Sequence, residues 1–234
     1  EDRIYQGFND SDSRALNARI ALTPNKDHDI IAEIGTAKQH FISTPGKTLL
    51  DTDVLSDRKF ERDNYSLQHK GRWGWASSDT YVQHEKTRNI ARDMAIKNTV
   101  FSSSWVVPVG DAHIVTTGVF YNKQDLSDTT THTLPGTDRT TADRTQYAWF
   151  LEEWRLRDDF ALTGGLRFDD DSKGGSQWSP RLYGVYNLDS RWTVKGGVST
   201  GFRAPSLRQT LGDWGQSSRG GNIYGNPDLK PAKS

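Results

Sequence analysis

The polar segment after Phe202 carries cations interleaved with aromatic rings. The cations are Arg203, Arg208, Arg219 and Lys230, and the rings are Trp214 and Tyr224. An arginine beside an aromatic ring offers a charge and a cation–π contact together, worth roughly 0.5–2 kcal/mol per pair. Such a segment favours the binding of a ligand over the making and breaking of bonds.

Two other polar stretches, which the pattern predicts as loops, add further cations. Residues 85–96 contain Lys86, Arg88 and Arg92, and residues 124–144 contain Arg139 and Arg144. Taken together, the candidate ligand-binding residues are Arg219, Trp214, Tyr224, Arg208, Arg203, Lys86, Arg88 and Arg144. Arg219 ranks first because two glycines follow it and give its loop freedom to adapt.

No residue pattern points to catalysis or to a bound metal. The sequence shows no Ser–His–Asp or paired-carboxylate arrangement, and its six histidines lack metal-ligand spacing. The three consecutive aspartates at 169–171 could hold a cation, but such a run is more commonly a solvated loop edge. We therefore expect no catalytic residue, no metal ligand and no cofactor.

The composition favours a membrane β-barrel. The 234 residues include 30 basic and 30 acidic side chains, so no bulk charge favours a nucleic-acid partner. Apolar residues make up 33% and the mean hydropathy is −0.77, yet aromatic residues reach 11%, which disordered chains do not. A barrel resolves this conflict, because half of each strand faces a wet lumen. No apolar run approaches the roughly 18 residues of a membrane helix, and there is no cysteine.

Residue types alternate with a period of two along ten segments, which predicts ten antiparallel strands. The predicted strands cover 16–22, 29–34, 61–69, 73–84, 97–108, 112–124, 145–156, 160–169, 181–188 and 192–203. The last is the clearest, with Val194, Gly196 and Val198 on one face and Lys195, Gly197 and Ser199 on the other.

The connections come in two sizes that alternate. Short turns are predicted at 24–27, 70–72, 109–111, 157–159 and 189–190, and long polar loops at 42–60, 85–96, 124–144 and 170–180. This alternation is typical of outer-membrane barrels, which have tight periplasmic turns and long outer loops.

Aromatic residues gather near both kinds of connection, as the two bilayer interfaces require. Tryptophans 73, 75, 105, 154 and 192 lie near short turns, and phenylalanines 60, 120, 168 and 202 lie near the long-loop ends.

Several segments resemble the barrel of TonB-dependent outer-membrane receptors. The most specific are WSPRLYGVYNL (178–188), WTVKGGVSTGFRAPSL (192–207) and IYGNPDLKPAKS (223–234), in that order. YAWFLEEWRLRDDFALTGGLRFDD (147–170) and YSLQHKGRWGW (65–75) extend the similarity, whereas residues 1–60 match only in general character. The resemblance is closest to the catecholate siderophore branch of the family, which includes the colicin I receptor type.

The resemblance implies an all-β transmembrane antiparallel barrel of 22 strands filled by a plug, a size class that leaves a plugged lumen. About ten of those strands would lie here, with residues 1–234 all in the barrel domain and the N-terminal plug and C-terminal strands absent. The chain would then belong to a receptor in the bacterial outer membrane that takes up a ferric siderophore, energised by TonB through the missing plug.

The ligand implied by the resemblance is a ferric tris-catecholate, a bulky anion with aromatic faces, and its iron would be cargo and not a cofactor. Outer-membrane lipid and lipopolysaccharide would surround the barrel, and colicins and phages are further candidate partners for its loops. Lys195 and Arg203, on the lumen side, would contact the plug or steer the ligand.

Two departures from the family pattern affect local structure. The loop before PDLKP reads SSRGGNIYG and lacks the cysteine pair of the colicin I receptor type, so its shape is freer. The run WFLEEW is one residue shorter than usual. Because a one-residue change flips the side chains of a strand, we expect a bulge near Glu152 and Glu153.

Two other classes of function stay open on the residues alone. A ten-stranded outer-membrane hydrolase would need acidic residues and histidine at the outer rim, such as His84, His132 and Asp170. A passive pore or adhesin would have loops that bind no small molecule.

Overall fold

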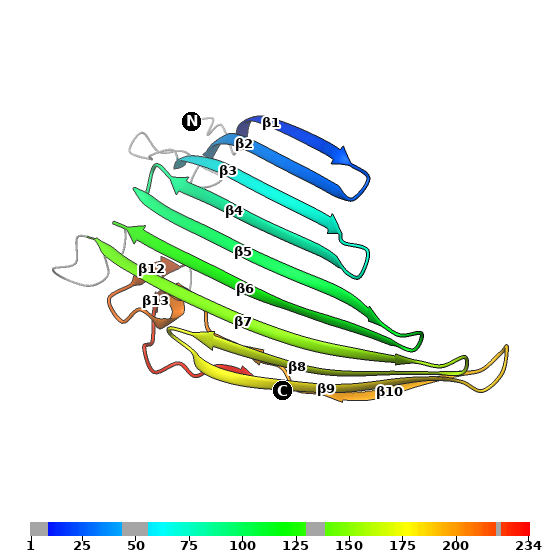
Figure 1. Cartoon of the computed structure of the whole chain (residues 1–234). Helices are drawn as coiled ribbons and strands as arrows, with labels where there is room; N and C mark the ends of the chain where they lie inside the picture. Colours follow the sequence, from blue (N-terminus) through cyan, green and yellow to red (C-terminus); the bar gives the residue numbers. More distant parts are fainter. Residues whose placement is uncertain (1–8, 44–55, 130–138, 219–220) are drawn as a thin grey trace, which may run out of the picture.

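A computed structural model shows a ten-stranded antiparallel sheet in which each strand pairs with the next along the chain (Figure 1). The structure describes residues 9–43, 56–129, 139–218 and 221–234. The sheet consists of β1 (Asn9–Asn25), β2 (His28–Ser43), β3 (Ser56–Arg72), β4 (Ser77–Asn89), β5 (Met94–Val109), β6 (His113–Asp128), β7 (Thr140–Leu156), β8 (Phe160–Asp171), β9 (Gly175–Asn187) and β10 (Thr193–Ser199). The predicted number of strands and their antiparallel order are confirmed.

The two faces of the sheet differ in chemistry, because paired residues share a face. Ile20 pairs with Ala32, Val82 with Phe101, and Leu166 with Leu151, all on the convex face. These side chains stay exposed: Ile20 is 62% and Val194 58% accessible. Apolar side chains that stand outward along a whole sheet do not form a water-soluble core, and they match the predicted lipid-facing belt.

Aromatic rings border this belt at both ends of the strands. At the short-turn end, Trp105 stacks between Trp73 and Trp75, with centroid distances of 5.9 and 6.0 Å. At the other end, the rings of Phe168 and Trp178 lie 4.7 Å apart. The predicted bands are therefore present, but with a partly different membership.

Three of the aromatic residues expected in these bands lie on the concave face of the sheet instead, and Phe202 lies beyond the last strand of the sheet. Trp154 pairs with Thr163, Phe120 with Ser102, and Phe60 with Gln39, on the face opposite the apolar belt. Their distance from a turn had suggested a place in the lipid-facing bands. The face that a side chain takes depends instead on whether its position in the strand is odd or even.

Strands run further than predicted on the side of the long loops. Residues 85–96 and 170–180 were expected to be loops, yet only 90–93 and 172–174 lie between strands. Cross-strand ion pairs explain the difference: Arg88 Nη2 lies 2.7 Å from Glu61 Oε2, and Arg62 pairs with Glu85. Polar sequence outside the belt therefore continues as sheet. Much of the predicted 42–60 loop, residues 44–55, lies outside the described residues.

Two local predictions were wrong. The turn expected at 70–72 lies at 73–76, where Gly74 has a φ of +84°, a conformation that favours glycine, so β3 continues through Arg72. The bulge expected near Glu152 and Glu153 is absent, because β7 pairs with β6 and β8 in unbroken register through both residues. The sheet accepts the shorter run without a local irregularity.

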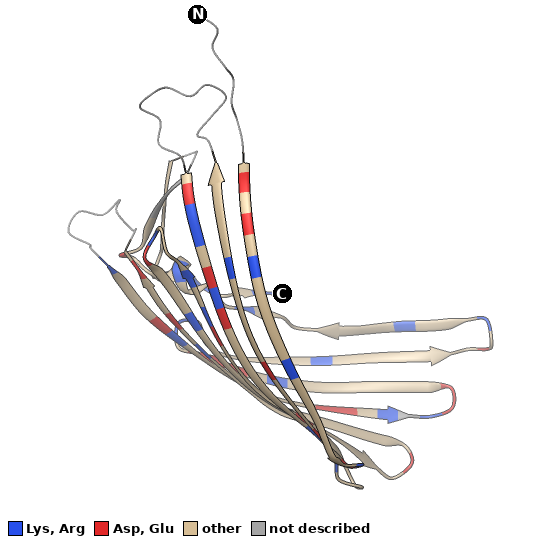
Figure 2. Cartoon of the chain, turned by 90° about the horizontal axis from the view of Figure 1, so that it is seen from above, with Lys and Arg blue, Asp and Glu red and all other residues tan. Residues whose placement is uncertain are grey.

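Residues 200–218 and 221–234, here called the return segment, leave the sheet and lie inside its bend (Figure 2). They contain β11 (Phe202–Arg203), the 3₁₀ turn η1 (Leu207–Thr210), β12 (Gly215–Ser218), β13 (Gly221–Tyr224) and β14 (Ala232–Lys233). The last predicted strand was expected to reach residue 203 but ends at Ser199. Thr200 N donates to Pro180 O at 3.1 Å, and proline has no N–H to return the bond, so the ladder stops there.

Apolar side chains of the return segment pack on the concave face at the outer ends of the strands. Leu207, Leu211 and Trp214 cluster with Leu126 of β6, and the cluster is bordered by Met94, Ile96 and Ala142. In the part of the chain that the structure describes, no helix is long and apolar enough to cross a membrane.

Candidate ligand-binding site

The candidate site lies where the return segment meets β6, β7 and β8, beginning with a buried carboxylate. Asp128, the last residue of β6, has no exposed surface. Its Oδ2 accepts hydrogen bonds from Arg92 Nη2 at 3.0 Å and from the Trp214 indole at 3.1 Å. A buried charge is tolerable only when it is paired and hydrogen-bonded, so this contact fixes the return segment on the sheet.

Arg208 of η1 lies over the ring of Trp214. Its guanidinium carbon lies 5.8 Å from the ring centroid, and its Nη2 lies 2.7 Å from Met94 Sδ. Burial lowers the pKa of Arg208 below its ordinary value; the charge of Asp128 opposes this shift, and the nearby Arg92 adds to it. The expected pairing of arginine with an aromatic ring is present, but Trp214, only 6% exposed, serves the packing.

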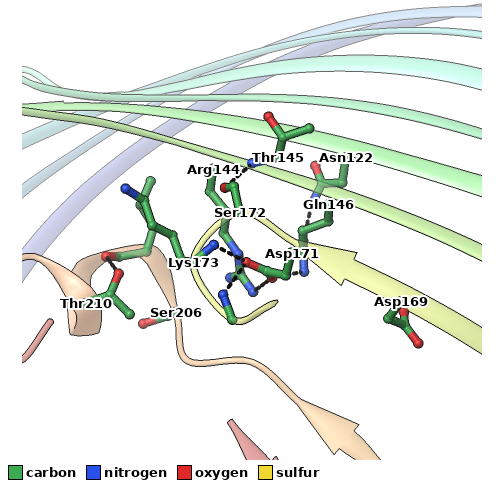
Figure 3. A network of polar contacts seen from close by, with 12 residues as sticks. Asn122, Arg144, Thr145, Gln146, Asp169, Asp171, Ser172, Lys173, Ser206 and Thr210 are labelled. Atoms are coloured by element: carbon green, nitrogen blue, oxygen red, sulfur yellow. Dashed lines mark hydrogen bonds and ion pairs between the residues drawn. The ribbon is translucent and has the colours of Figure 1, made fainter. Parts of the chain in front are cut away.

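A second buried ion pair joins the outer ends of β7 and β8 (Figure 3). Arg144 Nε donates to Asp171 Oδ2 at 2.8 Å, its Nη2 contacts the same oxygen, and Gln146 Nε2 donates to it at 2.9 Å. The other oxygen, Oδ1, accepts the backbone N–H groups of Lys173 and Gly174 at 2.9 and 3.0 Å.

This network sets the charge of Asp171. Burial by itself would raise the pKa of the carboxyl. The Arg144 hydrogen bonds, the two backbone donors and the positive charge of Arg144 together outweigh that effect and lower the pKa below its ordinary 3.8. Asp171 is therefore ionised at neutral pH and holds the 172–174 turn against β7.

Beside this network lies a recess of about 270 Å³ on the concave side. Its lining includes the rings of Phe120 and Phe202, the cations Arg144, Arg167 and Arg203, and the carboxylates Asp169, Asp170 and Asp171. Arg167 is engaged by Asp169 at 2.7 Å, whereas no ion pair to the exposed Arg203 occurs among the described residues. The recess is larger than a cavity of roughly 150 Å³ that holds a benzene ring. It thus offers space for one flat ring, beside phenylalanine faces and an available guanidinium.

The predicted site residues are distributed unevenly around this recess. Arg203 and Arg144 line it, although Arg144 is occupied by Asp171. Arg208 and Trp214 support the return segment, and Tyr224, 49% exposed, lies in β13. Arg219 lies outside the described residues.

Lys86 and Arg88 occupy a different surface. They were expected on a loop with Arg92, but both lie in β4, where they pair with Asp63 and Glu61 in rows of the convex face. The structure therefore does not bring them together with Arg203. Loop prediction failed here because charged side chains in a strand can pair across it as readily as they solvate a loop.

Sequence reasoning missed Arg167, Phe120 and Asp128. The available signal for Arg167 was its parity in the 160–169 strand, which puts it on the polar face with Thr163. No local signal identified Asp128, because its partners Arg92 and Trp214 are 36 and 86 residues away. Among the described residues, no three His, Asp or Glu side chains gather closely enough to hold a metal ion.

Comparison with known proteins identifies the family to which the chain belongs. The family described as "TonB dependent receptor-like, beta-barrel" matches residues 2–234. The chain belongs to the TonB-dependent receptors. The recognition made on the GFRAP and NPDLKP segments is thereby confirmed, as are the all-β barrel class and the outer-membrane location.

The chain has relatives among outer-membrane proteins whose names refer to regulation by iron or to ferric siderophores. It is 44% identical to the iron-regulated outer membrane virulence protein of Vibrio cholerae, over all of this chain and 36% of that protein. It is 28% identical to the ferric enterobactin receptor PirA of Pseudomonas aeruginosa, over 85% of this chain and 33% of that protein. The chain therefore spans about a third of the length of these relatives.

A solved structure agrees in fold. The siderophore receptor PirA from Pseudomonas aeruginosa superposes with a TM-score of 0.80 and 25% identity, covering 95% of this chain and 41% of that one. The relatives are receptors and transporters and not enzymes, so they give the hydrolase alternative no support.

Proposed function

We propose that this chain forms part of the barrel wall of a receptor that takes up a ferric siderophore of the catecholate type. The whole of residues 1–234 would be barrel, with a plug domain and further strands supplied by sequence beyond it. Iron would pass as cargo within the siderophore, with no resident cofactor. TonB would energise uptake by acting on the plug.

The observation that carries the proposal is the recess around Arg203. Its guanidinium has no carboxylate partner among the described residues, and Phe120 and Phe202 lie in the same lining. A catecholate complex presents negative oxygens at the edge of flat rings, so a cation beside aromatic faces complements both of its features. The relatives named for ferric enterobactin add weight to this choice of ligand class.

The test is equilibrium binding to the full-length receptor. Ferric catecholate added at micromolar concentration should quench tryptophan fluorescence, whereas a neutral ferric trihydroxamate should not. Equal quenching by both complexes would contradict the catecholate assignment. Absence of quenching by either would contradict binding at this wall altogether.

Energy coupling needs a separate experiment in cells. Cells that make the full-length receptor should accumulate radioactive iron from the ferric catecholate only when TonB is present. Accumulation that continues without TonB would leave a passive pore as the better account.

A further inference from the structure

The convex face carries a groove that the proposed function does not use. It has a volume of about 530 Å³, and Leu151, Leu162 and Leu166 form its apolar walls. Gly164 forms its floor, since a Cβ built there would meet no atom within 4 Å. The groove lies on β7 and β8, both of which have a paired strand on either side, so its shape is complete in this chain.

Charged groups occupy the end of the groove nearest the 157–159 turn. Arg155 is exposed, and no ion pair to it occurs among the described residues. Two residues away, Glu153 Oε1 lies 2.7 Å from His113 Nδ1, and the glutamate side chain is still 56% exposed. A guanidinium and an accessible carboxylate thus stand side by side on the lipid-facing wall.

The depth of these charges limits what they can contact. On a barrel's lipid face a basic residue costs about 2–4 kcal/mol at the bilayer midplane but about 0–1 kcal/mol near the interfaces. Arg155 pairs with His113, the first residue of β6, so it lies at the strand end with the interfacial tryptophans. Headgroups of the lipid leaflet at the short-turn side are found at this level.

We propose that this groove binds one glycerophospholipid whose headgroup carries both a phosphate and an ammonium group. The phosphate pairs with the Arg155 guanidinium, which matches its geometry bidentately. The ammonium pairs with Glu153, and an acyl chain runs over Gly164 between the three leucines. Beyond the Glu153–Gly164 pair, Leu151 and Leu166 continue the apolar wall toward the middle of the strands.

The presence of both charges decides the lipid class. A headgroup with phosphate alone would still pair with Arg155, but it would place a second negative charge beside the Glu153 carboxylate and bring no ammonium group to it, which disfavours anionic lipids. The inference requires only that the convex face meets lipid. It is independent of which ligand the concave face binds.

The test is native mass spectrometry of the full-length receptor, exchanged into phosphatidylethanolamine or phosphatidylglycerol with identical acyl chains. The wild type should retain one phosphatidylethanolamine in preference to phosphatidylglycerol. Arg155→Gln should reduce retention of both lipids by about tenfold, the loss of one charge-assisted contact. Glu153→Gln should remove the preference and leave binding through phosphate.

Two further variants separate binding from folding. Gly164→Val fills the open floor with a residue that strands accept well, so it should abolish retention while the barrel stays folded by its heat-modifiable migration in gels. Arg157→Gln, a turn arginine outside the groove, should retain lipid as the wild type does. Equal retention of the two lipids by the wild type, or equal losses in Arg155→Gln and Arg157→Gln, would overturn the proposal.

Discussion

The Trp214 indole N–H donates a hydrogen bond to Asp128 Oδ2 at 3.1 Å, although 86 residues separate them in the chain. This contact joins the return segment to the end of β6, and Arg92 holds the same carboxylate oxygen at 3.0 Å. Arg203, which lines the recess, belongs to the return segment, so its position depends on this buried contact.

Substitution of Trp214 by phenylalanine should loosen the return segment. The ring contact with Arg208 can remain, but Asp128 loses a donor inside the protein, at a cost of about 1–2 kcal/mol. Hydrogen exchange measured by mass spectrometry should then show amides of 207–214 exchanging about tenfold faster or more. The exposed Trp178 gives a matched control, because Trp178→Phe should leave these amides unchanged. Unaltered exchange in Trp214→Phe would mean that packing alone holds the segment.

Loss of Arg144 should destabilise the outer ends of β7 and β8. Its side chain is 7% and that of Asp171 2% exposed, so Arg144→Gln leaves a buried carboxylate without its cation. Removing one partner of a buried pair costs about 3–5 kcal/mol. Exchange of the Lys173 and Gly174 amides should report this loss, and the double variant with Asp171→Asn should recover part of it. Arg167→Gln, which breaks an exposed pair, should cost about 1 kcal/mol or less.

The same carboxyl predicts a pH dependence for the 172–174 turn. The folded-state pKa of Asp171 is lowered below 3.8, so its stabilising effect is complete above that value and is lost as the pH falls through the folded pKa. A spin label on Lys173→Cys, in a chain without other cysteines, should stay immobile at neutral pH and gain mobility only below pH 3.8. With Asp171→Asn the mobility should not change with pH. A transition near pH 6 would indicate another group.

Ligand binding should depend on Arg203 and not on the basic pair of β4. If the proposed function is right, Arg203→Gln should weaken ferric catecholate binding to the full-length receptor by about tenfold, the value of one charge-assisted contact. The double variant Lys86→Gln and Arg88→Gln removes two charges from the convex face and should bind as the wild type does. The reverse order of effects would place the ligand outside the barrel lumen.

The sheet could be predicted from sequence because its period-2 signal is local. Val194, Val198 and Ile20 stand on the face that the alternation assigned to them, and their exposure is confirmed. Strand ends were less predictable, since Arg88 and Glu85 are stabilised by partners on the neighbouring β3. The place where the last strand ends depends on Pro180 of β9, the strand that pairs directly with it.

The sequence predicted which types of residue form the candidate site, but not which of them lie together. Cations and rings in the return segment indicated binding, but the burial of Trp214 and Arg144 depends on Asp128 and Asp171, both distant in sequence. The convex position of Lys86 followed from register, which the assumption of a loop had obscured. Charged residues therefore need a strand assignment before they can be assigned to a site.

The central claim is that lipid covers the convex face while the concave face is polar and enclosed. Spin labels at consecutive positions of the middle strands test it directly in full-length receptor reconstituted in bilayers, with oxygen and a water-soluble nickel complex as relaxing agents. Labels at Val119 and Leu166 should relax with oxygen, and labels at Phe120 and Arg167 should not. Equal oxygen relaxation at Leu166 and Arg167, or a reversed order, would contradict the account.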